Sequence, residues 1–196
     1  MNKTLLGCGA ALLAFLLIGC IFVWSSYNGL VGLDEGVKAA WGDVETQYQR
    51  RLDLIPNLVS TVKGAANFEQ ETLQAVVEAR SKVGQTNISG APNGAQLREF
   101  QANQDALSGA LSRLLVVVEQ YPDLKATAAF RDLQVQLEGT ENRIAVARKR
   151  FNDAAQAFNT KRRGFPTVLF ASAFGFEEKP YFEAAAGADQ APKVQF

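Results

Sequence analysis

The sequence has no histidine, and its two cysteines, Cys8 and Cys20, both lie in an apolar run near the N-terminus. The rest of the chain therefore has no disulfide, no thiol nucleophile, no imidazole base and no Cys or His ligands for zinc. A glycine-rich phosphate loop and the HExxH motif are also absent, and no serine or carboxylate residues are spaced as a catalytic set. We therefore expect a protein that is not an enzyme, holds no cofactor or metal and has no small-molecule substrate.

The chain also lacks an excess of charge of either sign. Its 20 Lys and Arg residues match its 20 Asp and Glu residues, and setting Lys3 aside leaves 19 basic residues in the remainder. A balanced charge creates no long-range field that attracts nucleic acid. We expect no nucleic-acid partner.

What the chain does have is an unbroken apolar run from Leu5 to Trp24 with no charged residue. Twenty helical residues rise about 30 Å, the thickness of the hydrocarbon core of a bilayer, whereas the core of a cleaved signal peptide is roughly 7–15 residues long. Residues 1–26 are therefore predicted to be a membrane anchor. Because Lys3 is the only basic residue before Lys38, the positive-inside rule places the N-terminus in the cytoplasm and the bulk of the chain outside it.

The same run allows a second form of anchoring. Leu17-Ile18-Gly19-Cys20 resembles a lipobox, in which the chain is cut before the cysteine and a lipid is attached to it. However, the apolar run continues beyond Cys20, whereas a mature lipoprotein usually becomes polar soon after its cysteine. We favour an uncleaved transmembrane helix, and a lipoprotein anchored through Cys20 is the alternative, ahead of a secreted product.

The remainder of the chain has the apolar periodicity of long helices. Two segments carry apolar residues at alternating spacings of three and four, which predicts buried helix faces. The positions, apolar except for Gln104 and Thr140, are Leu97, Phe100, Gln104, Leu107, Leu111, Leu114, Val118 and Tyr121 in one segment, and Phe130, Leu133, Leu137, Thr140, Ile144, Ala147, Phe151, Ala154 and Phe158 in the other. Upstream stripes comprise Val37, Trp41, Val44 and Tyr48, and then Ile55, Val59, Val62, Ala66, Leu73, Val76 and Val83. Core packing accounts for all of them.

Breaker residues divide this pattern into helices. Pro56 is best accommodated in a first helical turn, so Asp53 is expected to cap a new helix. The stretch 84–92 has the composition of a loop, Asn93 and Gln96 form a capping-box pattern, and Tyr121-Pro122-Asp123 separates the last two helices. The predicted helices are 27–52, 54–83, 94–120 and 123–163.

The predicted fold is therefore all-α: an N-terminal transmembrane helix followed by an antiparallel up-down-up-down four-helix bundle. If the first helix instead continued through Pro56 as a kinked rod, the result would be a three-helix bundle whose rod overhangs its partners. The expected domains are the anchor at 1–26, the helical domain at 27–176 and a flexible tail at 177–196.

Several short motifs together resemble the LemA family of bacteria. They are Tyr27-Asn28, Trp41, Gln49-Arg50-Arg51, Asp53-Leu54-Ile55-Pro56-Asn57-Leu58-Val59, Tyr121-Pro122-Asp123-Leu124, Glu141, Arg148, Phe151-Asn152, Phe158-Asn159, Phe165-Pro166 and Phe174-Gly175-Phe176. The resemblance implies a membrane-anchored helical-bundle protein with no established enzymatic activity and with a relative associated with magnetosome membranes. Family members start with either a plain span or a lipobox-like segment, and this chain has elements of both. The expected location is the bacterial inner membrane, with a single pass and the bulk of the chain extracytoplasmic.

Some polar residues fall where the helical pattern expects apolar ones. Unpaired charges in a core are costly, so inward-facing acids and bases should meet across helices. We expect an interhelical polar cluster, and the alternative is that each residue lies on a solvated flank. The candidate residues are Glu69, Arg80, Gln104, Glu141 and Arg148.

A basic triplet and an uncharged, phenylalanine-rich segment follow the last helix. With an even number of helices, both should lie beside the membrane. We favour a lid that closes the end of the bundle, and the alternative is an interfacial segment in which the basic residues meet anionic headgroups and the phenylalanines enter the acyl boundary. The residues are Lys161, Arg162, Arg163, Phe165, Phe170, Phe174 and Phe176.

The chain ends in Pro192-Lys193-Val194-Gln195-Phe196 after a stretch of small residues that indicates a mobile linker. Val194, Phe196 and the terminal carboxylate fit a domain of the PDZ kind, which adds a strand and captures a carboxylate. The favoured alternative is that Val194 and Phe196 fold back onto the protein or have no role.

Two functions remain compatible with these features. The first is a non-enzymatic envelope protein that scaffolds or modulates membrane partners, in contact with the lipid bilayer and as a homo-oligomer. The second is an accessory module that binds one partner, such as a membrane protease or another envelope protein. Surface recognition leaves no sequence motif that distinguishes them.

Overall fold

The computed structural model describes residues 3–64, 69–85, 88 and 90–183, with side chains from Leu12 onward. All regular secondary structure in these residues is helical. The elements are α1 (Lys3–Lys63), α2 (Gln70–Gly84), α3 (Gly94–Val118), α4 (Pro122–Lys125), α5 (Ala128–Arg163) and the 3-10 turn η1 (Thr167–Leu169).

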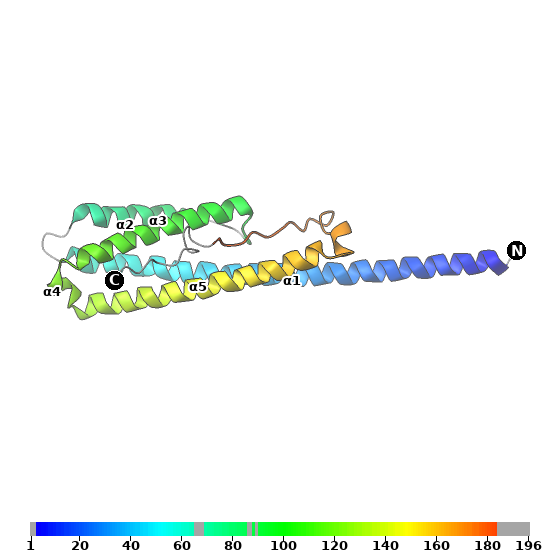
Figure 1. Cartoon of the computed structure of the whole chain (residues 1–196), viewed down its shortest axis with the longest axis horizontal. Coiled ribbons are helices and arrows are strands. Elements are labelled where there is room, and N and C mark those ends of the chain that lie inside the picture. The colour runs from blue at the N-terminus through cyan, green and yellow to red at the C-terminus, as the bar shows by residue number, and fades with distance from the viewer. Residues whose placement is uncertain (1–2, 65–68, 86–87, 89, 184–196) are drawn as a thin grey trace, which may run out of the picture.

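The helices lie roughly parallel to one long axis, and α1 projects beyond the others (Figure 1). Packing is concentrated in two pairs, α1 with α5 and α2 with α3. The chain runs in one direction along α1 and α3 and in the opposite direction along α2 and α5. The C-terminal half of α1 therefore packs in the helical domain, while its N-terminal part extends beyond the domain.

The predicted helix boundary at Asp53 is wrong, because α1 continues without interruption through Pro56. Proline has no N–H for the carbonyl four residues earlier, which is that of Leu52. Arg80 of α2 supplies the missing donor, with its Nε 3.3 Å from the Leu52 oxygen. Asp53 lies within the helix and accepts a 2.8 Å hydrogen bond from Gln49 Nε2.

The alternative of a helix that continues through Pro56 is confirmed, but the single rod of a three-helix bundle is not, because α1 ends at Lys63 and α2 begins anew at Gln70. The last long helix begins later than predicted, at Ala128, because residues 122–125 form the separate short helix α4. Thr127 caps α5 by accepting a hydrogen bond from the Phe130 N–H. The predicted capping box is confirmed: Asn93 accepts from Gln96 N–H, and Gln96 Oε1 accepts from Asn93 N–H.

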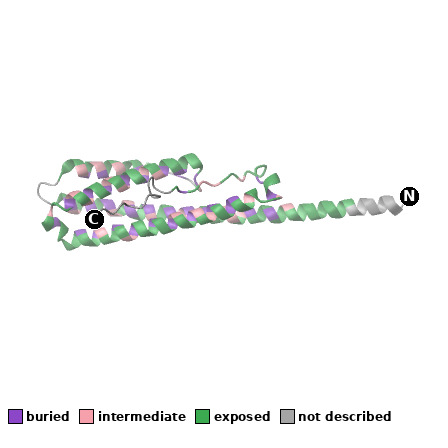
Figure 2. Cartoon of the chain, viewed as in Figure 1, coloured by how far each residue is buried: buried purple, intermediate pink, exposed green. Residues whose placement is uncertain are grey.

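The predicted repeats line the core (Figure 2). Every predicted position of the α3 repeat from Leu97 to Val118 is buried. The α5 repeat from Phe130 to Phe158 is buried except at Ala154, whose neighbour Ala155 is fully buried instead. Ala66 lies outside the described residues. The periodicity alone therefore identified most of the core.

The expected flexible tail is wrong for residues 177–183, here called the strap, because the strap packs along α5. Asn159 accepts a 2.9 Å hydrogen bond from Lys179 N–H and donates a 2.8 Å bond to the Lys179 carbonyl. Asn152 binds Phe182 in the same way, at 2.8 and 3.1 Å. Residues 184–196, including Val194 and Phe196, lie outside the described part of the chain.

The two Phe-Asn pairs of α5 explain this docking. They are seven residues apart, which places them on one face of the helix. In each pair the phenylalanine, Phe151 or Phe158, is fully buried, while the asparagine beside it pairs with the strap backbone. The core face and the strap-binding face of α5 are thus adjacent.

Candidate functional site

The most buried charged group of the described residues is Arg51 of α1, whose side chain is 1% exposed. Its Nη1 donates to Glu141 Oε1 of α5 at 2.7 Å and to Ser108 Oγ of α3 at 2.9 Å. Its Nη2 donates to Gln104 Oε1 of α3. The guanidinium carbon also lies 5.0 Å from the centre of the Tyr48 ring. One arginine therefore connects α1, α3 and α5 in the middle of the core.

This network contains only two of the five residues expected to form an interhelical polar cluster, Gln104 and Glu141. Of the others, Glu69 accepts a local hydrogen bond from Thr72 Oγ1 at 2.9 Å, and Arg80 binds the Leu52 carbonyl. Arg148 donates to the Glu183 carbonyl at 2.9 Å and lies over the Phe182 ring, so it holds the strap.

The sequence interpretation missed Arg51 because it ended the first helix before Pro56. Along a continuous helix, Val44, Tyr48, Arg51 and Ile55 are spaced by four, three and four residues, which places Arg51 on the buried stripe. The signal was present in the spacing. It required the knowledge that the helix continues.

The other candidate site lies where α1 leaves the helical domain. There the phenylalanine segment, residues 165–176, follows the end of α5 and lies against α1. The Tyr27 ring of α1 contacts the rings of Phe174 and Phe176, with centroids 5.3 and 5.6 Å apart. Arg162 holds the segment by donating from Nε to the Phe176 carbonyl at 2.7 Å and from Nη2 to Ser172 Oγ at 3.4 Å. Lys161 lies against Gly29 of α1.

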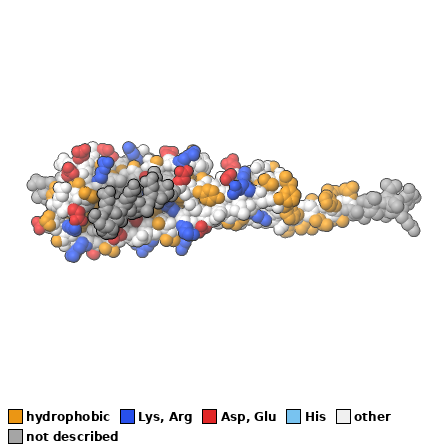
Figure 3. Space-filling view, in the orientation of Figure 1, with side chains coloured by type: hydrophobic (Ala, Val, Ile, Leu, Met, Phe, Trp, Pro, Cys, Tyr) orange, Lys and Arg blue, Asp and Glu red, His pale blue; other side chains and the backbone are white. Residues whose placement is uncertain are grey.

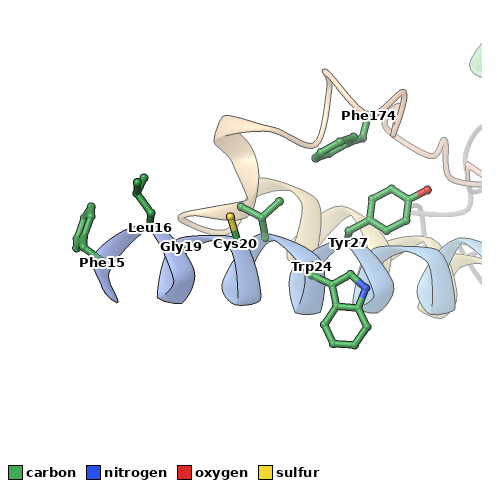
Figure 4. A pocket seen from close by; sticks show the side chains of 8 residues that line it. Phe15, Leu16, Gly19, Cys20, Trp24, Tyr27 and Phe174 are labelled. Atoms are coloured by element: carbon green, nitrogen blue, oxygen red, sulfur yellow. The ribbon is translucent and has the colours of Figure 1, made fainter. Parts of the chain in front are cut away.

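A groove of about 560 Å³ runs between α1 and this segment. In Figure 4 the Phe174 ring is directed toward α1 on the side of Cys20 and Tyr27. Figure 3 shows hydrophobic side chains gathered at this junction, whereas acidic and basic side chains are interspersed over the visible face of the domain. The groove is lined by Phe15, Leu16, Gly19, Cys20, Val23, Trp24, Tyr27 and Phe174.

An ion-pair cluster joins the strap to α1 just inside this junction. Lys179 Nζ lies 2.6 Å from Asp34 Oδ1, and Lys38 Nζ lies 2.9 Å from Asp34 Oδ2. Burial raises the pKa of Asp34, but the hydrogen bonds from Lys179 and Lys38 outweigh it and hold the pKa of this carboxyl below its ordinary value. Lys179 also lies 5.0 Å from the centre of the Phe158 ring.

Acidification is expected to weaken this attachment. The folded pKa of Asp34 is below the unfolded value of about 3.9, so its contribution to stability is present above that value and is lost as the pH falls through the folded pKa. The measurement is the difference in unfolding free energy between the wild type and Asp34→Asn at several pH values. This difference should be constant near neutral pH and shrink below about pH 4.

The matched control for Asp34→Asn is Asp153→Asn, because Asp153 forms an exposed ion pair with Lys149 on α5. Exposed pairs contribute little to stability, so this change should have a small effect at every pH. A difference between wild type and Asp34→Asn that does not vary with pH would contradict the proposed role of the carboxylate.

These features define an all-helical protein with one long apolar N-terminal helix, and α1 is the one helix of the described residues that is long and apolar enough to cross a membrane. The chain belongs to the LemA family, whose model matches residues 40–196. It is similar to Magnetosome protein MamQ 2 of Paramagnetospirillum magneticum, with 28% identity over 182 residues that cover 83% of this chain and 66% of the relative. It is also similar to Magnetosome protein MamQ of Magnetospirillum gryphiswaldense, with 25% identity and the same coverage.

A further relative is Protein LemA of Metamycoplasma hominis, with 25% identity over 158 residues that cover 81% of this chain and 69% of the relative. The chain spans just under two thirds of the length of the magnetosome relatives that it matches.

Proposed function

We propose that this protein is a non-enzymatic, single-pass membrane protein that holds its helical domain on the bilayer surface as a scaffold for membrane partners. The observation that supports the proposal is the continuity of α1. The side chains of Leu12 to Ile18 described at its N-terminal end are largely exposed, whereas Leu30, Val37 and Trp41 of the same helix are buried in the domain core. No loop separates the two parts.

A continuous helix transmits orientation. Because α1 has 61 residues without a break, the way in which it crosses the bilayer also sets the direction in which the domain projects. In this proposal α1 from Tyr27, α2, α3 and α5 form an up-down-up-down bundle outside the cytoplasm. Lys3 marks the cytoplasmic end of α1.

The buried polar groups support a structural role rather than catalysis. Arg51 and Gln104 bind each other, and Asn159 binds the strap backbone and the Tyr181 hydroxyl. Buried polar groups of a folded protein are generally hydrogen-bonded within the fold. Here their hydrogen bonds connect one part of the fold to another.

Photo-crosslinking in native membranes tests the scaffold role. A photoreactive residue at each of the exposed positions Val77, Val116, Val135 and Val146 samples the surfaces of α2, α3 and α5. A scaffold that assembles with itself and with several partners should give a ladder of products that includes self-crosslinked species. The control is the same residue at the fully buried Leu114, which should give no intermolecular product.

One dominant crosslink to a single foreign protein would contradict the scaffold role. It would indicate an accessory module for that protein instead. The absence of any intermolecular product from all four exposed positions would contradict both functions.

A further inference from the structure

Three large apolar residues of the phenylalanine segment, Phe165, Val168 and Leu169, are exposed, whereas Phe176 packs against the core. Thr167 and Ala171 are 3% and 1% exposed, whereas Phe165 and Leu169 are 83% and 73% exposed. A lid that closed the end of the helical domain would bury its largest apolar side chains, because their burial is the main source of stabilisation. Exposed apolar clusters of this kind mark surfaces that contact a partner or a membrane.

The segment is also held at a defined place. Arg162 binds the Phe176 carbonyl and Ser172, and Tyr27 packs against Phe174. Arg162 is therefore occupied within the protein, which leaves Lys161 and Arg163 as the exposed basic residues of the triplet. The segment is attached to α1 within about one turn of Trp24, the last residue of the apolar run.

The groove identifies the environment that the segment faces. Its lining extends along α1 from Tyr27 back to Phe15, roughly 18 Å deeper along the helix axis. If α1 crosses the bilayer, the deeper part of the groove lies among acyl chains and its mouth lies among headgroups. The exposed Phe165, Val168 and Leu169 are then next to the headgroup level, where amphipathic membrane-surface segments place their aromatic and aliphatic residues.

We propose that the phenylalanine segment is a second membrane-contacting element, which inserts its exposed side chains into the interface of the bilayer that α1 spans and leaves the groove to a lipid acyl chain. Lys161 and Arg163 are exposed in the last turn of α5, just before this element, and basic residues are typical neighbours of interfacial segments. The domain is then held to the membrane at two points, by α1 and by this segment. This inference rests on the membrane insertion of α1 that is part of the proposed function.

The test measures the depth of a fluorescent probe in the full chain. Leu169→Cys in a Cys8→Ala/Cys20→Ala background is labelled with an environment-sensitive fluorophore and reconstituted in phosphatidylcholine nanodiscs at one copy per disc. Quenching by lipids that carry a nitroxide near the headgroup should be several-fold stronger than for the same probe at Val135→Cys. Quenching by aqueous iodide should show the opposite order.

Val135 is a matched control because it is 67% exposed and lies on α5, about 40 Å from Arg163 along the helix. Val168→Cys is a second probe position in the segment, in case the first variant fails to fold. A probe on the native Cys20, in the chain with Cys8→Ala alone, reports separately whether α1 is inserted.

The outcomes separate the two proposals. Lipid quenching at both Cys20 and Leu169 supports the inference. Quenching at Cys20 combined with a Leu169 probe that behaves like the Val135 probe overturns the inference and leaves the membrane anchor intact. No lipid quenching at Cys20 overturns the anchor and the inference together. Lipid quenching at Leu169 only in discs that hold two copies assigns the segment to contact between copies and overturns the inference.

Discussion

Replacing Arg51 with alanine is expected to lower the free energy of unfolding by about 2–5 kcal/mol, the usual range when a long buried side chain is truncated and a cavity remains. The change removes the donor to Glu141, Ser108 and Gln104 and leaves a cavity where three helices meet. The control is Arg50→Ala, because Arg50 is the preceding arginine and is exposed. Exposed substitutions of this kind change stability by about 0.5 kcal/mol or less. Chemical denaturation of both variants in the same detergent provides the comparison.

A second substitution separates the effect of losing the Arg51 charge from the effect of losing its side-chain volume. Arg51→Met removes the buried charge but keeps most of the side-chain volume, so it avoids most of the cavity that alanine leaves. Glu141 is half exposed, so water can solvate it when its partner is lost. We therefore expect Arg51→Met to be clearly more stable than Arg51→Ala. Equal effects of Arg51→Ala and Arg50→Ala would contradict the role of the buried network.

The parts of this fold that could be predicted are those with a local or periodic signal. The repeats in α3 and α5 identified the buried faces because each position follows from the spacing of neighbouring residues. The Asn93 capping box was predictable for the same reason, since its two side chains bind backbone groups three residues apart. The apolar run of α1 needed only length and composition.

The parts that could not be predicted depend on distant partners. The passage of α1 through Pro56 relies on Arg80, which lies 28 positions beyond Leu52 in the sequence and donates a hydrogen bond to the free Leu52 carbonyl. Local preference favours a break at a proline, and this tertiary contact outweighs it. The strap is a similar case. Its own composition suggests no regular structure, and hydrogen bonds with Asn152 and Asn159 hold its backbone in place.

The error at Pro56 also concealed the centre of the polar network. Once the first helix was ended before the proline, Arg51 belonged to a helix terminus rather than to the buried stripe that joins Tyr48 to Ile55. The candidate residues were then sought on other helices, where only Gln104 and Glu141 belong to the network. An error in one helix boundary therefore became an error in the candidate site.

The composition of the phenylalanine segment indicated an unusual surface, but it did not indicate which residues face outward. That required the positions of Thr167 and Ala171, which are buried, relative to Phe165 and Leu169, which are not. With six large apolar residues in the segment, the apolar composition alone fits either a lid or an interfacial element. The exposure of Phe165, Val168 and Leu169 is the observation on which the proposal of an interfacial element rests.

The structure also explains how the junction between α1 and the domain is stiffened. The core cluster nearest the projecting part of α1 combines residues of α1, α3 and α5 with Ala171 of the phenylalanine segment and Phe182 of the strap. The segment and the strap therefore belong to the same packed unit as the helices. Trp41 lies in this cluster and contacts three of its parts.

Trp41→Ala is expected to lower the free energy of unfolding by about 3–5 kcal/mol, the usual range for removal of a large buried aromatic side chain. Trp41 is 1% exposed, and its ring centroid lies 5.1 Å from that of Phe100 in α3 and 5.6 Å from that of Phe151 in α5. It also stacks on Phe182 of the strap at 6.2 Å. The variant should therefore lose stability and release the strap together.

Two measurements separate these effects. Denaturation in detergent gives the loss of stability, and amide hydrogen exchange at Lys179 and Phe182 reports the strap, since both N–H groups bind asparagine side chains in the wild type. The matched control is Trp24→Ala, because Trp24, the other tryptophan of the chain, is 69% exposed on the projecting part of α1. Trp41→Ala should accelerate exchange at both strap amides, and Trp24→Ala should change neither the stability of the domain nor the exchange. Unchanged strap exchange in a destabilised Trp41→Ala variant would show that Asn152 and Asn159 hold the strap without the aromatic contact.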